Sequence, residues 1–138
     1  MRAFIDTSSL FKKYIEENGS KKLEELLGSV SEIIIAPITI LEVNSILERR
    51  LKEKSINSLD AKWIEKEFLR DYDYFGIIEF NDNLVRECIR VVRRYQLKVL
   101  DGIQLSSAIF SRPQLFIVSD LRLFEAAKKE MPHIEFVG

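Results

Sequence analysis

Short apolar runs alternate with amphipathic stretches along the whole chain of 138 residues, and this alternation limits the folds that are open to it. The apolar runs predict strands at residues 3–5, 33–36, 76–80, 115–118 and 134–137. The amphipathic stretches predict helices at residues 9–15, 20–27, 40–54, 59–72, 101–110 and 120–130, and one more that Asn81 caps and that ends near Tyr95. Parallel strands need a crossover between them, usually a helix, so such an alternation is typical of parallel sheets. The sequence therefore predicts an α/β fold: a single three-layer domain over residues 1–138, with a mostly parallel sheet of four to five strands flanked by helices.

The overall composition suits a globular protein and does not by itself indicate a nucleic-acid partner. Hydrophobic residues make up 46% and charged residues 31%, with a net charge of −1, so any attraction for phosphate must come from local basic groups or bound cations. Cys88 is the only cysteine, which excludes an internal disulfide and suggests a reducing compartment. It lies in the apolar stripe of the helix that Asn81 caps, so we expect a core residue. This stripe consists of Leu84, Val85, Cys88, Ile89, Val92 and Tyr95.

No segment of the sequence predicts a membrane helix. The longest apolar run, residues 33–41, is interrupted by Pro37 and falls well short of the roughly 20 residues that span a bilayer. The start of the chain contains Asp6 within its apolar stretch, which is not typical of a signal peptide. We therefore expect a cytoplasmic protein without a membrane partner.

Four carboxylates stand where predicted strands end or predicted helices begin. Asp6 and Asp120 each follow a strand, Asp101 opens a helix, and Glu42 lies in the first turn of another. In an open parallel sheet the carboxyl ends of the strands share one edge, where ligands bind, so these acids can converge. A local explanation is open as well. Asp is a favoured N-cap, which accounts for Asp101 and Asp120, and Thr39 with Glu42 fits a capping box.

If the four carboxylates converge, they need a cation. Two like charges about 4 Å apart repel by about 4 kcal/mol at an effective dielectric constant near 20. Such a cluster would raise some of its own pKa values and lose charge without a counter-ion. Oxygen ligands favour Mg²⁺ or Mn²⁺ over Zn²⁺, and a chain with one His and one Cys offers no other set of metal ligands. We therefore expect magnesium or manganese.

The four acids lie in segments that read FIDTSSLFKKY, IAPITILEVNSIL, LDGIQLSSAI and IVSDLRL. In the same order, these segments resemble the motifs of the PIN-domain ribonucleases, and most closely those of the VapC-type toxins of toxin–antitoxin pairs. The likeness spans nearly the whole chain, and the third segment is its most specific part. It implies a PIN-like fold in which Asp6, Glu42 and Asp101 bind the metal ion, while Asp120 completes the site or holds a second ion.

The resemblance also implies an activity and partners. It implies an endoribonuclease that uses Mg²⁺ or Mn²⁺ to hydrolyse RNA phosphodiester bonds and leaves 5′-phosphate and 3′-hydroxyl ends. A VapC-type protein would be the toxin of a type II pair, held inactive by a cognate antitoxin protein, and would form a homodimer through its helices.

Hydroxyl residues beside the acids belong to the same resemblance. Thr7 and Ser8 resemble the hydroxyls that steady the first Asp. The family often has a hydroxyl residue two places before the last acid, where this chain has Val118, and Ser119 is the hydroxyl next to Asp120 instead. The sequence thus predicts Thr7, Ser8 and Ser119 as supporting residues.

The basic residues, the single histidine and two alternative functions complete the prediction. Basic groups at residues 49–52, 90–98 and 128–129 are either solvated helix faces or guides for an RNA backbone. The single His133 excludes cleavage by a histidine pair and is expected at the surface. The alternative is a PIN-like module that binds RNA or protein without cutting. A phospho-accepting receiver domain would need paired acids after the first strand, where this chain has Asp6 alone.

Overall fold

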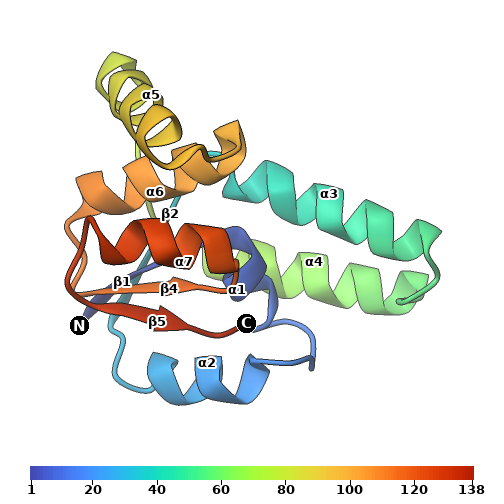
Figure 1. The fold of residues 1–138 in the computed structure, drawn as a ribbon. Coiled ribbons are helices and arrows are strands. Elements are labelled where there is room, and N and C mark those ends of the chain that lie inside the picture. The colour runs from blue at the N-terminus through green and yellow to red at the C-terminus, as the bar shows by residue number, and fades with distance from the viewer.

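The computed structural model describes all residues, 1–138, as a central sheet with helices on both of its faces (Figure 1). The strands are β1 (Arg2–Ile5), β2 (Glu32–Ile35), β3 (Gly76–Ile77), β4 (Leu115–Val118) and β5 (Ile134–Phe136). The helices are α1 (Thr7–Phe11), α2 (Ser20–Leu27), α3 (Thr39–Lys52), α4 (Ser58–Tyr72), α5 (Asp82–Tyr95), α6 (Val99–Ser111) and α7 (Leu121–Lys128). None of these helices is both long enough and apolar enough to cross a membrane.

The five strands are all parallel and follow the order β3-β2-β1-β4-β5. Strand β1 lies in the middle, where Phe4 pairs with Ile34 of β2 on one side and with Phe116 of β4 on the other. The chain first moves outward from β1 to β3 and then returns to place β4 on the opposite side of β1. The strand order therefore reverses between β1 and β4, and the predicted parallel sheet is confirmed in an all-parallel form.

Two separate hydrophobic clusters pack against the two faces of the sheet. Alternate residues of the strands point to opposite faces, so Ile5 and Ile117 belong to the cluster under α1 to α4, while Phe4 and Phe116 belong to the cluster under α5 to α7. The rings of Phe4 and Phe116 meet edge to face with their centroids 5.4 Å apart. Because both faces are covered, the strands read as continuous apolar runs. This arrangement confirms the predicted single three-layer α/β domain.

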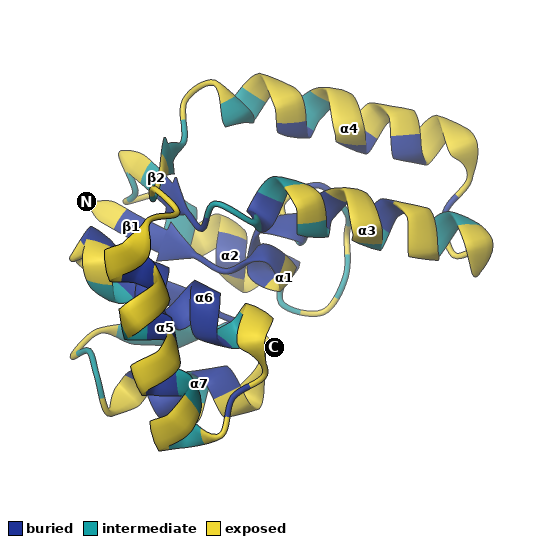
Figure 2. Cartoon of the chain, turned by 90° about the horizontal axis from the view of Figure 1, so that it is seen from above, coloured by how far each residue is buried: buried dark blue, intermediate teal, exposed yellow.

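Helices α3 and α4 form a hairpin that extends beyond the sheet (Figures 1 and 2). Helix α4 begins with a reciprocal capping box between Asn57 and Asp60. The fully buried Phe68 packs against Tyr14 with ring centroids 5.9 Å apart, and the Tyr14 hydroxyl donates to Asp71 at 2.7 Å. These contacts attach the hairpin to the segment that follows α1.

Several boundaries differ from the predictions, among them those of the third strand, the first helix and the helix that carries Asp101. The strand expected at residues 76–80 is only two residues long, because its partner β2 ends at Ile35 and Pro37 follows. The helix expected at residues 9–15 is α1, which starts earlier because Asp6 caps it directly after β1. Helix α6 starts at Val99, two residues before Asp101.

Candidate active site

Asp6 sits at the switch point of the sheet, at the carboxyl end of the central strand β1. It is the N-cap of α1, where its Oδ1 accepts a hydrogen bond from the Ser9 backbone N–H at 3.0 Å. The side chain is 4% exposed, and this burial raises its pKa to about 6. Hydrogen bonds from Ser9 and the nearby backbone of Ser119 favour the charged form, whereas the negative charge of Asp101 opposes it. Asp6 is therefore a buried carboxylate that is destabilised as an anion.

Asp101 lies in the first turn of α6 and is half-buried. Its pKa is raised first by burial and then by the negative charges of Asp120 and Glu42, while Lys98 and Arg122 act in the opposite direction. The N-cap of α6 is Lys98, so the explanation of Asp101 as a capping residue is wrong. The charges of Asp120 and Glu42 act on Asp101, and the charge of Asp101 acts on Asp6, so Asp101 interacts electrostatically with all three other acids.

Asp120 combines a capping role with a place beside Asp101. It is the N-cap of α7, and its Oδ1 accepts from the Leu123 backbone N–H at 2.8 Å. The side chain is exposed, and its charge is among those that raise the pKa of Asp101. Asp120 can therefore cap α7 and also interact with Asp101, because the cap engages only one of its two carboxylate oxygens.

Glu42 is held by side chains from other helices rather than by its own. The capping box with Thr39 is wrong, because the N-cap of α3 is Ile38 and no side chain caps this helix. Instead, Oε1 of Glu42 accepts hydrogen bonds from Thr7 Oγ1 and from Gln104 Nε2, each at 2.8 Å. The buried Thr39 hydroxyl lies 3.1 Å from Thr7 Oγ1 and joins the same network.

The supporting hydroxyls occupy other roles than the sequence predicted. Thr7 steadies Glu42, not Asp6, and Ser8 is exposed and makes no hydrogen bond to an acid. The Asp6 carboxylate is instead fixed by the hydrogen bond that it accepts from the Ser9 backbone N–H. The Ser119 hydroxyl is buried without a partner, and the contribution of this residue is the backbone effect on Asp6. A hydroxyl behind Asp120 is therefore missing, in keeping with the fully buried Val118.

The comparisons with known proteins decide the family. The sequence profile of the PIN domain matches residues 3–129, which is most of the chain. The chain belongs to the PIN domain family. The PIN fold also appears in solved structures that are similar to it: a toxin–antitoxin complex from Klebsiella pneumoniae has a TM-score of 0.69 at 19% identity and covers 99% of this chain and 98% of that chain.

Two further structures extend this likeness in fold. VapBC2 from Rickettsia felis, bound to a DNA fragment from its promoter, has a TM-score of 0.66 at 16% identity and covers 99% of this chain and 98% of that chain. FitAcB from Neisseria gonorrhoeae has a TM-score of 0.69 at 12% identity and covers 96% of this chain and 95% of that chain. A comparison with curated protein sequences gives no significant match. At these identities the solved structures show that the fold is shared.

The four acids of this PIN domain offer the oxygen ligands that suit Mg²⁺ or Mn²⁺. The caps use one oxygen each of Asp6 and Asp120, and the network uses Oε1 of Glu42, so each side chain keeps a second oxygen. The side chains feel one another's charge, yet no group of three or more His, Cys, Asp or Glu side chains is gathered closely enough to hold an ion as it stands. The donor chemistry fits a hard divalent cation, which would offset the repulsion that raises the pKa of Asp101.

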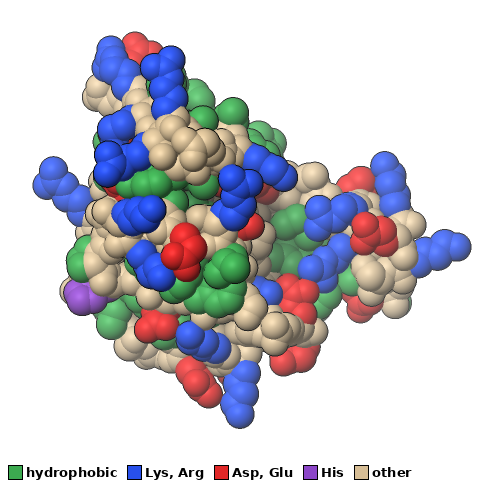
Figure 3. All heavy atoms as spheres, viewed as in Figure 1, with side chains coloured by type: hydrophobic (Ala, Val, Ile, Leu, Met, Phe, Trp, Pro, Cys, Tyr) green, Lys and Arg blue, Asp and Glu red, His purple; other side chains and the backbone are tan.

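Some basic residues of the PIN domain form ion pairs, and two others act on the acids through their charge. Arg50 pairs with Glu17, and Arg90 pairs with Glu87 and Glu130. Lys98 and Arg122 are the cations whose charge reaches Asp101. Lys and Arg side chains are numerous over the side of the molecule that α5, α6 and α7 form (Figure 3). His133 is exposed and precedes β5, at the opposite end of the strands from the acids.

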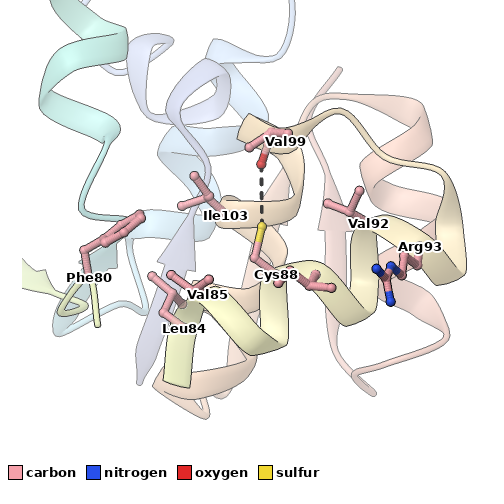
Figure 4. A pocket seen from close by; sticks show the side chains of 9 residues that line it. Phe80, Leu84, Val85, Cys88, Val92, Arg93, Val99 and Ile103 are labelled. Atoms are coloured by element: carbon pink, nitrogen blue, oxygen red, sulfur yellow. Dashed lines mark hydrogen bonds between the residues drawn. The ribbon is translucent and has the colours of Figure 1, made fainter. Parts of the chain in front are cut away.

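A cavity lies between α5 and α6, and the acids do not line it. It has a volume of about 370 Å³ and is apolar (Figure 4). Its lining consists of Phe80, Leu84, Val85, Cys88, Ile89, Val92, Arg93, Val99 and Ile103. The Cys88 thiol points toward the Val99 carbonyl at 3.9 Å, and burial raises its pKa, so it behaves as the core residue that the sequence predicts.

Proposed function

We propose that this PIN domain is a metal-dependent endoribonuclease. The observation that carries the proposal is that Asp6 and Asp120 cap the helices after the neighbouring strands β1 and β4 of a PIN fold, where the charges of Asp120 and Glu42 act on Asp101. Acidic side chains from distant parts of the chain that repel one another in this way are typical of a site built for a cation or for proton transfer. A capping role alone does not require their proximity.

The four acids divide the work of the reaction. Asp6, Glu42 and Asp101 would hold an Mg²⁺ or Mn²⁺ ion, with Asp120 completing the site or holding a second ion. When bound, such an ion lowers the pKa of a water molecule and stabilises negative charge on the phosphate oxygens. Oε2 of Glu42, which accepts no hydrogen bond from the protein, can take the proton that the attacking water loses. Water adds to phosphorus, the bond to the 3′ oxygen breaks, and that oxygen gains a proton, which leaves 5′-phosphate and 3′-hydroxyl ends.

A cleavage assay with single-residue variants tests this function. Purified protein is incubated with a panel of structured and unstructured RNAs in Mg²⁺, Mn²⁺ or EDTA. We expect cleavage only with the metal ions, and a loss of at least 100-fold in Asp101→Asn. Asp73→Asn, which changes an exposed acid at the end of α4, serves as the matched control. Cleavage that persists in EDTA, or that Asp101→Asn leaves intact, contradicts the proposal.

We propose that the protein is the toxin of a type II toxin–antitoxin pair and acts in the cytoplasm. The support is the similarity of fold to a toxin–antitoxin complex and to VapBC2. Expression of the chain alone should arrest growth, and Asp101→Asn should relieve the arrest. Co-expression of the neighbouring upstream reading frame should relieve it too and should yield a complex that survives co-purification. Normal growth with abundant wild-type protein contradicts the toxin assignment.

We propose that two copies pair through the apolar cavity between α5 and α6. Beside the buried Leu84, the exposed side chains of Phe80, Val85 and Ile89 leave this face uncovered. Helix α5 has an acidic first turn and a basic last turn, so two antiparallel copies place opposite charges and opposite helix ends together.

The oligomeric state tests this pairing directly. Light scattering after size exclusion should give a dimer for the wild type and a monomer for Ile89→Glu. Leu59→Glu, which adds the same charge to an exposed apolar position on α4, should remain a dimer. A monomeric wild type, or equal behaviour of the two variants, contradicts the assignment of this face.

The alternative is a PIN module that binds RNA without cutting it. Val118 in place of a hydroxyl residue and the loose arrangement of the acids favour this alternative. Metal-independent RNA binding by gel shift, with no cleavage of the same RNAs in Mn²⁺, would identify it.

A further inference from the structure

Gln104 is a buried polar residue that the sequence motifs do not assign. It is 3% exposed and lies one turn after Asp101 on α6, a helix whose buried side is otherwise built of apolar and small side chains. Its Nε2 lies 2.9 Å from Thr7 Oγ1, 2.8 Å from Glu42 Oε1 and 3.3 Å from Thr39 Oγ1. Gln104 lies on α6, the helix that carries Asp101. From there it contacts α1, which follows Asp6, and α3, which carries Glu42.

The chemistry of the partners fixes the orientation of the amide. A carboxylate only accepts hydrogen bonds, so the NH₂ group and not the carbonyl must face Glu42. Oε1 of Glu42 then receives one hydrogen from Gln104 and one from the Thr7 hydroxyl. Hydrogen bonds to an ionised group are the stronger kind, and these two leave Oε2 as the free oxygen of the side chain.

The other end of the amide is left without a partner. The Gln104 carbonyl oxygen is buried and accepts no hydrogen bond. An unpaired buried carbonyl destabilises the folded state, so an apolar side chain of the same length would serve packing better. Departures from local stability rules of this kind occur mainly at functional sites. The amide is thus explained by what its nitrogen does.

We propose that Gln104 is the positioning residue that sets Glu42 relative to Asp6 and Asp101. The inference rests on the proposed metal-dependent function and adds a residue to it. Through one amide group, the helix of Asp101 holds the carboxylate of α3 against Thr7, the residue that follows Asp6. Without the amide, Glu42 keeps only the Thr7 hydroxyl and can turn about its side-chain torsions.

Binding of Mn²⁺ to the protein without RNA gives a readout that does not depend on activity. Electron paramagnetic resonance of free Mn²⁺ measures the Kd directly. We expect Gln104→Met, which keeps the length but removes the donor, to raise the Kd for Mn²⁺ about 10-fold, because residues that orient ligands typically contribute 10- to 100-fold. In cleavage assays the same variant should lower kcat by a similar factor and change KM for RNA less than about twofold.

Matched variants separate positioning from packing. Ser106 is a fully buried polar residue of the same helix whose hydroxyl donates to the Gly102 carbonyl at 2.7 Å, so Ser106→Ala should leave Mn²⁺ affinity unchanged. Thr7→Val removes the other donor to Glu42 and should weaken Mn²⁺ binding as Gln104→Met does, which keeps the test valid if the latter fails to fold. The double variant should lose less than the sum of the two single losses.

The outcomes distinguish the two proposals. Wild-type Mn²⁺ binding that Gln104→Met leaves intact, or that Ser106→Ala weakens equally, overturns the positioning role and spares the proposed function. If the wild type binds no Mn²⁺, or if Asp101→Asn does not weaken the binding, both the positioning role and the proposed metal-dependent function are overturned. Weaker Mn²⁺ binding in Gln104→Met, together with no cleavage of any RNA by the wild type, supports the positioning role and removes the nuclease assignment.

Discussion

Replacing Asp6 by Asn tests the electrostatics of the acidic site through stability rather than through activity. Burial raises the pKa of Asp6 from 3.8 to about 6. A difference of about two pH units corresponds to about 3 kcal/mol, by which the folded protein is destabilised when this buried side chain is ionised. Asn has nearly the same shape and caps helices as well as Asp, so the hydrogen bond from Ser9 can persist. We expect Asp6→Asn to raise the free energy of unfolding by up to about 3 kcal/mol at pH 7.5.

The direction of the pH dependence follows from the two protonation states. Below pH 3.8 the carboxyl is protonated in the folded and unfolded chains, and the charge has no effect. Between pH 3.8 and about 6 the unfolded chain releases a proton that the folded chain retains, so the stability of the wild type falls as the pH rises. Above about pH 6 the whole destabilisation is present. The advantage of Asn should therefore be small at pH 4 and complete at pH 7.5.

Urea unfolding followed by circular dichroism measures this advantage. The experiment is run in EDTA from pH 4 to pH 7.5, because a bound cation would stabilise the ionised wild type. Asp73→Asn removes an exposed acid at the end of α4 and should change the free energy of unfolding by less than about 0.5 kcal/mol at every pH. The reasoning is refuted if Asp6→Asn is no more stable than the wild type at pH 7.5. It is also refuted if the gain in free energy of unfolding is the same at pH 4 and at pH 7.5.

Two further predictions concern packing and RNA binding. A Cβ at Gly102 would lie 2.4 Å from Val92 Cγ2, so Gly102→Ala should push α5 from α6 and lower the free energy of unfolding by about 1–3 kcal/mol in urea. An unchanged midpoint would mean that the two helices are not packed as described. Lys98→Glu and Arg122→Glu should each weaken RNA binding in low salt and reduce the slope of log affinity against log salt by about 0.7 for each phosphate that the side chain no longer neutralises. Lys21→Glu on the exposed surface of α2 is the control, and an equal loss of affinity in all three variants would argue against a path beside the acids.

The parts of the fold that the sequence predicts are those with local signals. Residues 20–27 and 115–118 form α2 and β4 with the predicted bounds. The cap of α5 by Asn81 is also confirmed, because the residue makes the hydrogen bond to the Leu84 N–H that its type and position suggest. Such signals depend only on neighbours within about one turn.

The parts that the sequence misses depend on contacts between distant segments. Thr39 and Glu42 fit the capping-box pattern, but both are engaged by Thr7 and Gln104, whose helices are far away in sequence. The polar Gln104 within an apolar helix was a signal that could have pointed to this network. A local pattern gives no information on which of two possible partners a hydroxyl or carboxylate will choose.

The apolar stripe of α5 gives the same lesson for packing. Leu84 and Cys88 are buried against α6 as expected, whereas Val85 is 39% and Ile89 47% exposed. Periodicity shows that a helix has an apolar side. How much of that side is buried by the rest of the chain depends on where the neighbouring helices end. The sequence therefore predicts the stripe and not its uncovered half.

The central place of β1 determines when the sheet and the cluster of acids can form during synthesis. Strand β1 is synthesised before β4, so Ile5 must wait for Ile117 before its free edge is paired. Asp120, which follows β4, is synthesised later still. A growing or truncated polypeptide thus lacks both the closed sheet and the complete set of acids. Pairing of sequence-distant strands is also slow, so the closed sheet and the complete set of acids form together in one late step of folding.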